Sequence, residues 1–375
     1  MSRAANISSI AVFRPAGLGD FIMTTPALLR LRERFSNARI TLLTLHSYDV
    51  TQAAKVRAYA GGIRAAPWID LIRPHLIDDV RVLPPIRDLN TLLEGRRIMA
   101  QIRPDLVVQM FDPGTPYIRR AMKMAFIASL SGPVRQIGWR QRGQIHPGRP
   151  PKHDPHLGHH VKGLLQFLRE LDGHRELSDS DVRFDIRAGA EAEQWANDWL
   201  AAAHLTERRL IAVAPGAIHD HKQWPVEQFA KLIKALVAIE PNAAFVIMGT
   251  GKDQALAARL ADAAPGQVHD LCGISSINQS AALFARCSLV VGNDGGAMHL
   301  ADAMGASVVS VVPGLEFPGS IEPWHNQDRA VRHEVPCAPC YSFTFCPEGH
   351  RRCMIELPLE PVLAQCKRAL FETVA

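Results

Sequence analysis

A carboxylate and an imidazole, Asp294 and His299, flank the glycine pair Gly295-Gly296. The apolar residues before Asp294 are typical of a buried strand, and those after Gly296 are typical of a helix. Such a turn presents unpaired backbone N–H groups at a helix N-terminus, which is an arrangement that binds anions. Phosphate binding alone needs neither a carboxylate nor an imidazole. The combination therefore predicts a phosphorylated donor with hydroxyl groups to hold and a bond to break.

A second glycine-containing turn, residues 14–20, lies near the start of the chain. Gly17 and Gly19 are expected to let the backbone turn tightly and to leave room for a substrate. Asp20 lies at the start of the following helix-like stretch, where aspartate is a favoured N-cap that stabilises a helix by about 1 kcal/mol. The same carboxylate is a candidate general base. The sequence favours the cap, and the two roles are not exclusive.

Two further loops follow apolar runs in the second half of the chain. Lys222 lies just before Pro225, which suits the first turn of a helix over 226–239. Its ammonium would either neutralise a diphosphate or lie as a solvated loop charge. Asp253 and Gln254 follow a short glycine-rich turn, where either side chain would reach a ribose or cap the next helix. Ligands of parallel α/β sheets bind beyond the carboxyl ends of the strands, so both loops are candidate parts of one site.

Two groups of residues have the chemistry of metal ligands. Asp179 and Asp181 form the paired carboxylates that many metal-dependent sugar transferases use, but they lie in a polar linker, so we expect a solvated acidic turn. Four cysteines crowd into one loop: Cys337, Cys340, Cys346 and Cys353. A four-thiolate zinc site usually has a more closely spaced second pair. Three interpretations of the cluster stay open: a structural zinc site, a redox-labile pair of thiols, and ordinary reduced thiols. Because the Asp179–Asp181 pair lies in a linker, we expect catalysis that needs no metal ion.

The composition is that of a soluble globular protein, with 47% hydrophobic and 21% charged residues in a chain of 375, long enough for two domains. The net charge of +5 is mild and is not gathered into the patch that nucleic-acid binding favours. No apolar run approaches the roughly 20 residues that span a bilayer, and the first residues lack the features of a signal peptide. We expect a cytoplasmic protein whose membrane contact is at most peripheral.

Short apolar runs alternate with helix-like stretches in both halves of the chain. The predicted strands are 10–13, 40–45, 80–83 and 106–111, then 210–214, 244–248, 289–291 and 308–312. This alternation predicts an α/β protein with parallel sheets and right-handed crossovers. We expect an N-terminal domain over 1–187, a second domain over 188–357, and a C-terminal helix within 358–375 that packs back on the first domain.

In their order and spacing these motifs resemble the heptosyltransferases, family nine of the glycosyltransferases. The resemblance covers residues 10 to about 370. It rests on residues 14–20 with 24–28, on 215–217 with 222–225, and on 292–301, and the loop that ends at Cys353 is similar too. It implies the GT-B fold, in which two Rossmann-like, doubly wound domains face a central cleft. It also implies an inverting sugar transfer that requires no metal ion or other cofactor.

The resemblance further implies roles for single residues. Known members transfer heptose from ADP-heptose to the inner core of lipopolysaccharide at the cytoplasmic face of the inner membrane. Asp20 would then deprotonate the acceptor, an anionic lipid-linked or related glycan, and Asp294 would bind the donor sugar. The implied phosphate contacts are Lys222, Gly295, Gly296 and His299, and the implied ribose contacts are Asp253 or Gln254. Nucleic acid is not an expected partner.

One departure from the family pattern concerns the donor. Many members have Asp-Thr-Gly or Asp-Ser-Gly where this chain has Asp294-Gly295-Gly296, so one hydroxyl contact to the sugar or phosphate is missing. Two other interpretations stay open at this point. The first is a nucleotide-sugar epimerase or hydrolase of the same fold, and the second is a non-catalytic nucleotide-sugar-binding protein. The presence of Asp20 favours a transferase over the binding protein.

Overall fold

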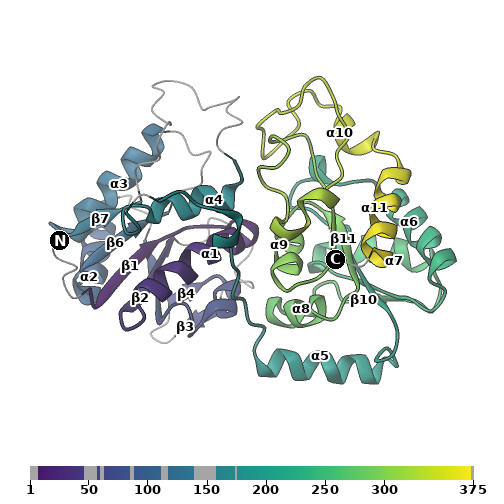
Figure 1. The fold of residues 1–375 in the computed structure, drawn as a ribbon, viewed down its shortest axis with the longest axis horizontal. Coiled ribbons are helices and arrows are strands. Elements are labelled where there is room, and N and C mark those ends of the chain that lie inside the picture. Colours follow the sequence, from purple (N-terminus) through teal and green to yellow (C-terminus); the bar gives the residue numbers. More distant parts are fainter. Residues whose placement is uncertain are drawn as a thin grey trace. The chain divides into compact units, whose positions relative to one another are not determined.

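The computed structural model describes residues 7–45, 57–59, 63–84, 88–110, 117–138, 158–173 and 175–372 (Figure 1). The chain divides into two compact units, Met1–Asp185 and Ile186–Ala375. This division lies close to the domain boundary that the sequence predicts after residue 187. Each unit has its own five-stranded sheet.

The first unit is built on a parallel sheet in the order β5-β2-β1-β6-β7. Its strands are β1 (Ser9–Phe13), β2 (Arg39–Leu45), β5 (Asp79–Leu83), β6 (Leu106–Gln109) and β7 (Arg135–Ile137). A short antiparallel pair, β3 (Arg57–Tyr59) and β4 (Ile63–Ala65), lies outside this sheet. The helices are α1 (Leu18–Arg34), α2 (Leu89–Ile102), α3 (Tyr117–Ser131) and α4 (His160–Leu165), with 3₁₀ turns η2 (Pro67–Ile72), η4 (Gln166–Leu168) and η5 (Asp179–Asp181).

The second unit repeats this order with the parallel sheet β10-β9-β8-β11-β12. Its strands are β8 (Leu210–Ala214), β9 (Ala244–Ile247), β10 (Val268–Asp270), β11 (Leu289–Asn293) and β12 (Val308–Val311). Its helices are α5 (Ala190–Ala202), α6 (Val226–Ile239), α7 (Gln254–Ala261), α8 (Ile277–Phe284), α9 (Gly296–Ala303), α10 (Arg352–Ile355) and α11 (Leu359–Phe371). Three 3₁₀ turns, η6 (Asp220–Lys222), η7 (Gly251–Asp253) and η8 (Trp324–Arg329), lie in its loops.

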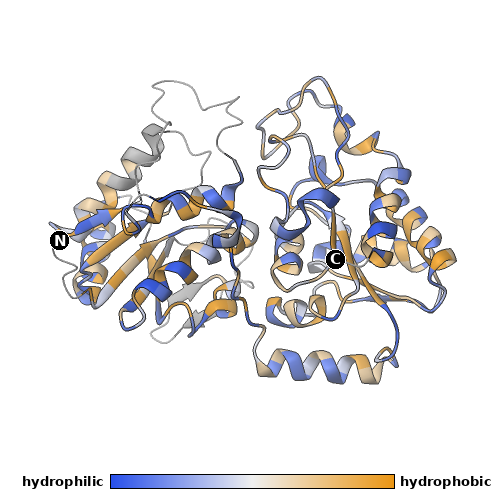
Figure 2. Ribbon diagram, in the orientation of Figure 1, coloured by the Kyte–Doolittle hydropathy of each residue, from blue (hydrophilic) through white to orange (hydrophobic). Residues whose placement is uncertain are grey.

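Both sheets are doubly wound. The central strands are apolar along their whole length and buried on both faces, as β8 and β11 show, because helices cover each side of a parallel sheet. Figure 2 shows these strands as continuous apolar stretches, whereas the helices alternate between apolar and polar residues. The strand order reverses between β1 and β6 in one unit and between β8 and β11 in the other. The predicted α/β class with two doubly wound parallel sheets is therefore confirmed.

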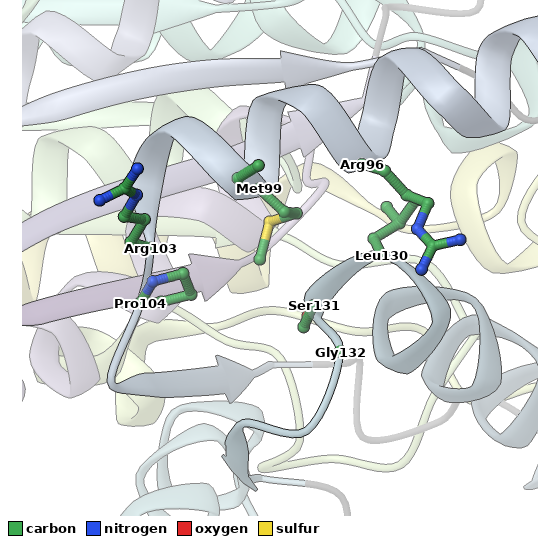
Figure 3. Close-up of a pocket in the computed structure, with 8 residues that line it drawn as sticks. Arg96, Met99, Arg103, Pro104, Leu130, Ser131 and Gly132 are labelled. Carbon is green, nitrogen blue, oxygen red and sulfur yellow. The ribbon is translucent and has the colours of Figure 1, made fainter.

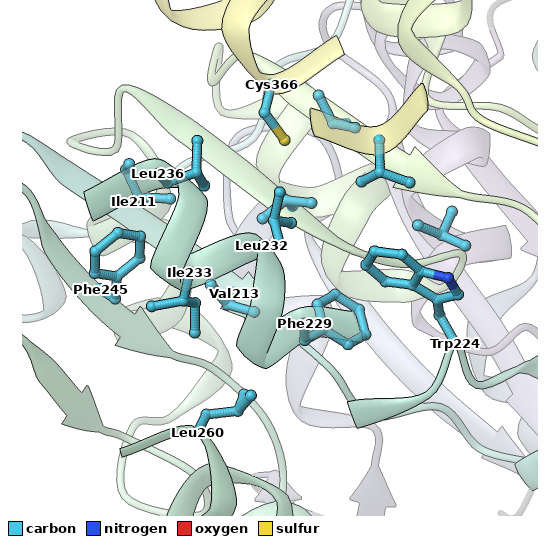
Figure 4. Packing of buried hydrophobic residues seen from close by; sticks show 14 of the residues in the cluster. Ile211, Val213, Trp224, Phe229, Leu232, Ile233, Leu236, Phe245, Leu260 and Cys366 are labelled. Carbon is cyan, nitrogen blue, oxygen red and sulfur yellow. The ribbon is translucent and has the colours of Figure 1, made fainter. Parts of the chain in front are cut away.

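The helix α11 belongs to the core of the second unit. Val362, Cys366 and Ala369 on one of its faces are buried in the same cluster as the apolar face of α6 (Figure 4). Figure 1 shows α11 beside α6, and the two helices are in contact. The packing of the C-terminal helix back on the first domain stays a prediction. Its apolar stripe is covered by the second unit, to which it is joined directly in sequence.

None of the helices in the described part of the chain combines the length and the apolarity that crossing a membrane requires.

Candidate active site

Asp20 lies in the first turn of α1, after the loop that follows β1. Gly17 is the N-cap of α1, with an extended backbone (φ −70°, ψ 174°), and Asp20 is the third residue inside the helix. The prediction that Asp20 caps this helix is therefore wrong, because the helix begins earlier than the aspartate. Its exposed carboxylate still lies where the helix dipole stabilises a negative charge.

The two glycines of this loop have ordinary backbones. Neither Gly17 nor Gly19 has a positive φ, so the predicted need for glycine to make a tight turn is wrong. A Cβ added at Gly17 would meet only Asp20 Oδ2, at 4.0 Å. Glycine at this position therefore keeps open the space beside the carboxylate, which agrees with the expected room for a substrate.

A buried arginine, Arg14, fixes the backbone of Asp20 through hydrogen bonds to its carbonyl group. Arg14 follows β1 directly and is 2% exposed. Its Nη2 donates to the Asp20 carbonyl (3.1 Å) and its Nε donates to Thr24 Oγ1 (2.9 Å), which in turn donates to the Asp20 carbonyl (2.7 Å). A buried guanidinium is stable only when its N–H groups are hydrogen-bonded, so Arg14 requires the Asp20 carbonyl and the Thr24 hydroxyl at these positions. The sequence shows an arginine directly after an apolar strand, but it does not show the partners of that arginine.

The helix α1 also contains a proline, Pro26, which has no N–H to offer the Ile22 carbonyl one turn earlier. The Thr25 hydroxyl donates to that carbonyl instead, at 2.8 Å. The first turns of α1 are thus completed by the hydroxyls of two successive threonines, Thr24 and Thr25, both buried. The helix that carries Asp20 is held in place on its buried side.

In the second unit, Asn293 ties together the loop that follows β8. It is the last residue of β11 and is 2% exposed. Its Oδ1 accepts from the Trp224 amide (2.9 Å) and its Nδ2 donates to the Pro215 carbonyl (2.7 Å), so one side chain binds both ends of the loop that carries Lys222. The preceding Gly292 permits a close approach of strands, because a Cβ there would lie 2.5 Å from the Ala214 carbonyl oxygen.

Asp294 and His299 bracket the N-terminus of α9. Gly295 is the N-cap of α9 and Gly296 is its first residue, as the sequence predicts. Asp294 is 9% exposed and His299 is 6% exposed. Burial raises the pKa of the Asp294 carboxyl, while the neighbouring charges of His299, Lys222 and Arg332 lower it. The structure therefore places the predicted carboxylate and imidazole beside a helix N-terminus, and Lys222 near enough for its charge to lower the pKa of Asp294.

Lys222 ends η6 and is partly buried. Its Nζ lies 5.6 Å from the centre of the Phe343 ring, which comes from the cysteine-rich loop. Two residues later, Trp224 is 1% exposed and its Nε1 donates to the Leu357 carbonyl (2.9 Å), which anchors the end of this loop in the core. Trp224 thus anchors the loop that carries Lys222 in the core of the second unit.

Asp253 and Gln254 lie where β9 leads into α7. Asp253 Oδ2 accepts from the Thr250 amide (2.7 Å) and from the Thr250 hydroxyl (2.9 Å), so this carboxylate caps η7. Gln254 Nε2 donates to the Cys272 carbonyl at 3.3 Å. A Cβ at Gly216 would overlap the Asp253 carboxylate, which places Asp253 beside the loop after β8. The carboxylate thus closes the turn η7 and makes no side-chain cap bond to α7, the next helix, and the ribose contact stays a prediction.

These loops lie where a doubly wound sheet binds its ligands. Strand order reverses between β8 and β11, and the loops of Lys222 and Asp294 leave the carboxyl ends of these two strands. A cation, a helix N-terminus and a buried carboxylate at such a switch point match the groups that hold a nucleoside diphosphate and an attached polar group.

Comparison with known proteins decides the family. Residues 118–349, more than half of the chain, match the family model described as "Glycosyltransferase family 9 (heptosyltransferase)". The chain belongs to glycosyltransferase family 9. The predicted family is thereby confirmed.

Curated relatives of this family-9 chain include two lipooligosaccharide heptosyltransferases. Lipooligosaccharide heptosyltransferase 2 of Haemophilus ducreyi is 38% identical over 306 residues, which cover 79% of this chain and 80% of that protein. The protein of the same name from Campylobacter jejuni is 29% identical over 169 residues, which cover 44% of this chain and 51% of that protein. The chain therefore spans about half the length of some curated relatives that it matches and four fifths of another.

A solved structure supports the fold of this family-9 chain. The ADP-heptose LPS heptosyltransferase II of E. coli aligns with a TM-score of 0.66 at 18% identity, covering 96% of this chain and 98% of that one. A likeness at this level of identity shows the fold, and it confirms the predicted GT-B type with two Rossmann-like domains.

The paired acidic residues of η5 bind cations of the protein itself. Asp179 forms an ion pair with Lys162, and Asp181 forms ion pairs with Arg30 (3.0 Å) and with Arg175. The guanidinium of Arg175, with further hydrogen bonds, holds the pKa of Asp181 well below its usual range. Asp179 is exposed, as predicted for a solvated turn, but the Asp181 side chain is only 10% exposed. The prediction of a solvated acidic turn therefore holds for Asp179 and is wrong for Asp181.

The four cysteines of the loop are partly buried free thiols in this family-9 chain: Cys337, Cys340, Cys346 and Cys353. Burial raises the pKa of the Cys337 and Cys353 thiols, which disfavours the thiolate form that binds metals. Among the described residues, no group of three or more His, Cys, Asp or Glu side chains is placed to hold a metal ion. The zinc hypothesis gains no support from this arrangement.

A pocket of about 470 Å³ lies between α2 and α3 in the first unit (Figure 3). Its walls include Arg96 and Met99 from α2 and Leu130 from α3. Pro104 and Gly132, which also line it, precede β6 and β7, so the pocket opens at the amino ends of these strands. Ligands of doubly wound sheets bind at the opposite edge, where Asp20 lies. This pocket is therefore no part of the candidate active site.

Proposed function

We propose that this chain is an inverting glycosyltransferase that moves heptose from ADP-heptose to a lipopolysaccharide-core or related glycan acceptor, without a required metal ion. Family membership supports sugar transfer, and the names of the relatives point to heptose, lipooligosaccharide and ADP-heptose. The observation that carries the proposal is the placement of Lys222 and the buried Asp294 on the loops that leave the carboxyl ends of β8 and β11, with Asp294 directly before the N-cap of α9.

The donor diphosphate would bind to Lys222 and to the N-terminus of α9. Backbone N–H groups at Gly295 and Gly296 have no partner within the helix, and they are directed at an anion placed there. The Lys222 ammonium supplies a full positive charge and His299 adds a polar side chain beside it. Together these groups would stabilise the ADP that departs with the electron pair of the broken glycosidic bond. This is the task that a divalent ion performs in other sugar transferases.

The donor sugar would bind through its hydroxyl groups to Asp294. A carboxylate accepts hydrogen bonds from hydroxyls, and at 9% exposure Asp294 has little competition from water. Burial raises the pKa of Asp294, and the charges of His299, Lys222 and Arg332 oppose this shift. Gly295 removes the hydroxyl that many family members carry at this position, so the donor makes one contact fewer. Asp253 or Gln254 would contact the ribose.

The bond-forming step would use Asp20. The acceptor hydroxyl oxygen attacks the anomeric carbon opposite the diphosphate, a new C–O bond forms as the sugar–phosphate bond breaks, and the hydroxyl proton passes to Asp20. A carboxylate must lie within hydrogen-bond reach of that oxygen to do this. The open space that Gly17 leaves beside Asp20, and the fixed backbone below it, support this role.

The acceptor would be an anionic glycan of a membrane lipid, and the protein would act in the cytoplasm and contact the inner membrane peripherally. The mild net charge of +5 suits an anionic acceptor. The relatives named for lipooligosaccharide support the same acceptor class.

The Asp20→Asn variant tests the proposed base. We expect turnover with ADP-heptose and a lipopolysaccharide-core acceptor to fall about 10²- to 10⁴-fold, because a general base contributes about that factor. The affinity for ADP-heptose, measured by calorimetry, should change less than about twofold, because Asp20 does not take part in donor binding.

Glu33→Gln is a matched control, because Glu33 is another exposed carboxylate of α1 and, among the described residues, pairs with the surface arginine Arg183 alone. It should keep full turnover. An equal loss of donor affinity in Asp20→Asn would contradict the base assignment. Free sugar or an epimer formed from the donor without acceptor would instead favour the hydrolase or epimerase interpretation. Inversion itself is checked by the anomeric configuration of the product in NMR spectra.

A further inference from the structure

The cysteine-rich loop contacts three consecutive residues of η6, the turn that ends in Lys222. Arg351 Nη1 donates to the Asp220 carbonyl at 3.0 Å. The backbone of Ser342 lies close enough to the His221 imidazole to raise its pKa, against the larger lowering by burial. The Phe343 ring then lies 5.6 Å from Lys222 Nζ. One loop thus touches the backbone of the turn, its buried histidine and its cation.

The loop is also bonded to the segment that follows β12. The Cys340 amide donates to the Gly314 carbonyl (3.0 Å) and the Tyr341 amide donates to the Leu315 carbonyl (2.9 Å), in the segment that follows β12. The Tyr341 ring packs edge-on against Phe317, with ring centres 6.1 Å apart. Phe343 follows two residues later, so its ring is presented to Lys222 from a fixed base.

A contact with the Phe343 ring can reduce the entropy that Lys222 loses when its ammonium is ordered on a phosphate. The ammonium ends a flexible stem of four carbons, and ordering it on a ligand costs rotamer entropy. The face of an aromatic ring attracts a cation with about 0.5–1 kcal/mol at exposed sites. A contact that exists before the ligand arrives lowers the entropy still to be lost on binding. Phe343 is 48% exposed, so about half of its surface is left open to solvent beside the Lys222 ammonium.

We propose that Phe343 is a positioning residue that holds the Lys222 ammonium in place for the donor diphosphate. The inference rests on the proposed function insofar as Lys222 binds that diphosphate. The cysteine-rich loop would then contribute to donor binding through the Phe343 ring, and its thiol groups would have no part in this. Phe345 gives the loop a built-in comparison, because it is 63% exposed and, within the described residues, no cation lies over its ring.

Affinity for ADP, measured by calorimetry, tests the energetic part. Phe343→Leu keeps an apolar side chain and removes the ring, and we expect ADP binding to weaken about two- to fivefold, which is the value of one exposed cation–π contact. Phe343→Trp should bind ADP as well as the wild type or better. Phe345→Leu should bind like the wild type. Equal weakening in Phe343→Leu and Phe343→Trp, or in Phe345→Leu, would overturn the proposal, because it would show a general disturbance of the loop.

Lysine NMR spectra test the placement without any ligand. After reductive methylation with ¹³C, which keeps the charge, the Lys222 methyl signal is assigned by its loss in Lys222→Arg. We expect this signal to be shifted by the ring in the wild type and in Phe345→Leu, and to move to the position of solvent-exposed lysines in Phe343→Leu. An unmoved signal would overturn the proposal. If the ring shift is present but the wild type binds no ADP, the placement of Lys222 stands and the proposed function fails.

Discussion

At the end of β11, the side-chain amide of Asn293 uses both of its polar atoms to bond the two ends of the loop that carries Lys222. In Asn293→Ala the Trp224 amide and the Pro215 carbonyl lose these partners in a buried place. Each unsatisfied group costs about 1–3 kcal/mol. We expect the second unit to lose about 2–4 kcal/mol of unfolding free energy in urea titrations, and ADP binding to weaken as the loop loosens.

The exposed Asn242 provides the comparison for this substitution. Asn242→Ala removes the same amide from the surface, where substitutions change stability by less than about 0.5 kcal/mol. If Asn293→Ala were as stable as Asn242→Ala, the two bonds of Asn293 would not hold the loop, and its position at the strand end would have to be explained by packing alone.

Residue types and spacing predict some of these side chains and not others. Asp294, His299 and Lys222 stand out because charged or polar residues in glycine-containing loops at strand ends are rarely needed for packing. Asn293 and Arg14 do not stand out. Their roles depend on partners that the fold brings close, such as Trp224 for Asn293, and an isolated asparagine or arginine carries no trace of them. The wrong prediction that Asp20 is the N-cap of α1 has another origin. The apolar pattern of a helix does not define its first residue to better than a few positions, and α1 begins two residues before Asp20.

Among the elements, the apolar strands were predictable, including the edge strands β5 and β12, whereas the edge strands β7 and β10 were not. The apolar runs that predict β1, β8 and β11 arise because helices cover both faces of these strands. In contrast, β7 and β10 have three residues each, lie at the sheet edges and are partly exposed, with sequences Arg-Gln-Ile and Val-His-Asp. Their place is set by backbone pairing with a neighbouring strand. The bounds of α11 were likewise predictable from its apolar stripe, but the stripe does not indicate which sheet will cover it.

The turn η5 connects α1 to the end of the first unit through Asp181, which accepts from Arg30 of α1 and from Arg175. The depressed pKa of Asp181 means that the folded state favours its charged form. The stabilisation is therefore complete above the ordinary aspartate pKa of about 3.9, and it is lost as the pH falls below that value through the folded-state pKa. We expect Asp181→Asn to lower the unfolding free energy of the first unit by about 1–2 kcal/mol at pH 7.

Urea titrations at pH 7, 5 and 3.5 check this dependence. The difference between wild type and Asp181→Asn should be the same at pH 7 and 5 and smaller at pH 3.5. Asp179→Asn is the matched control, because the Asp179 side chain is 77% exposed and an exposed ion pair contributes little. A difference that grows on acidification would contradict the role of the charged carboxylate.

On the scale of the whole chain, two units repeat one strand order, and the residues that carry the proposed chemistry divide between them. Asp20 lies in the first unit. The proposed donor contacts all lie in the second: Lys222, Asp253, Gln254, Asp294, Gly295, Gly296 and His299. The sequence predicts this duplication, because both halves show an apolar run followed by a glycine-containing loop and a helix. We therefore expect that the second unit can bind the donor without the first unit, which carries the residue proposed to deprotonate the acceptor.

A fragment of residues 186–375 should fold and bind ADP by itself. It contains a complete five-stranded sheet, a core that includes Trp224 and the apolar face of α11, and a bond from Asn278 Nδ2 to the Ala188 carbonyl (2.9 Å) that secures its first residues. We expect calorimetry to give an ADP affinity within about threefold of that of the full chain, since an intact core preserves the loops, and Lys222→Ala in the fragment should weaken it at least tenfold. The fragment should transfer no sugar, because it lacks Asp20. A folded fragment that does not bind ADP, while the full chain does, would show that the donor site needs residues of the first unit.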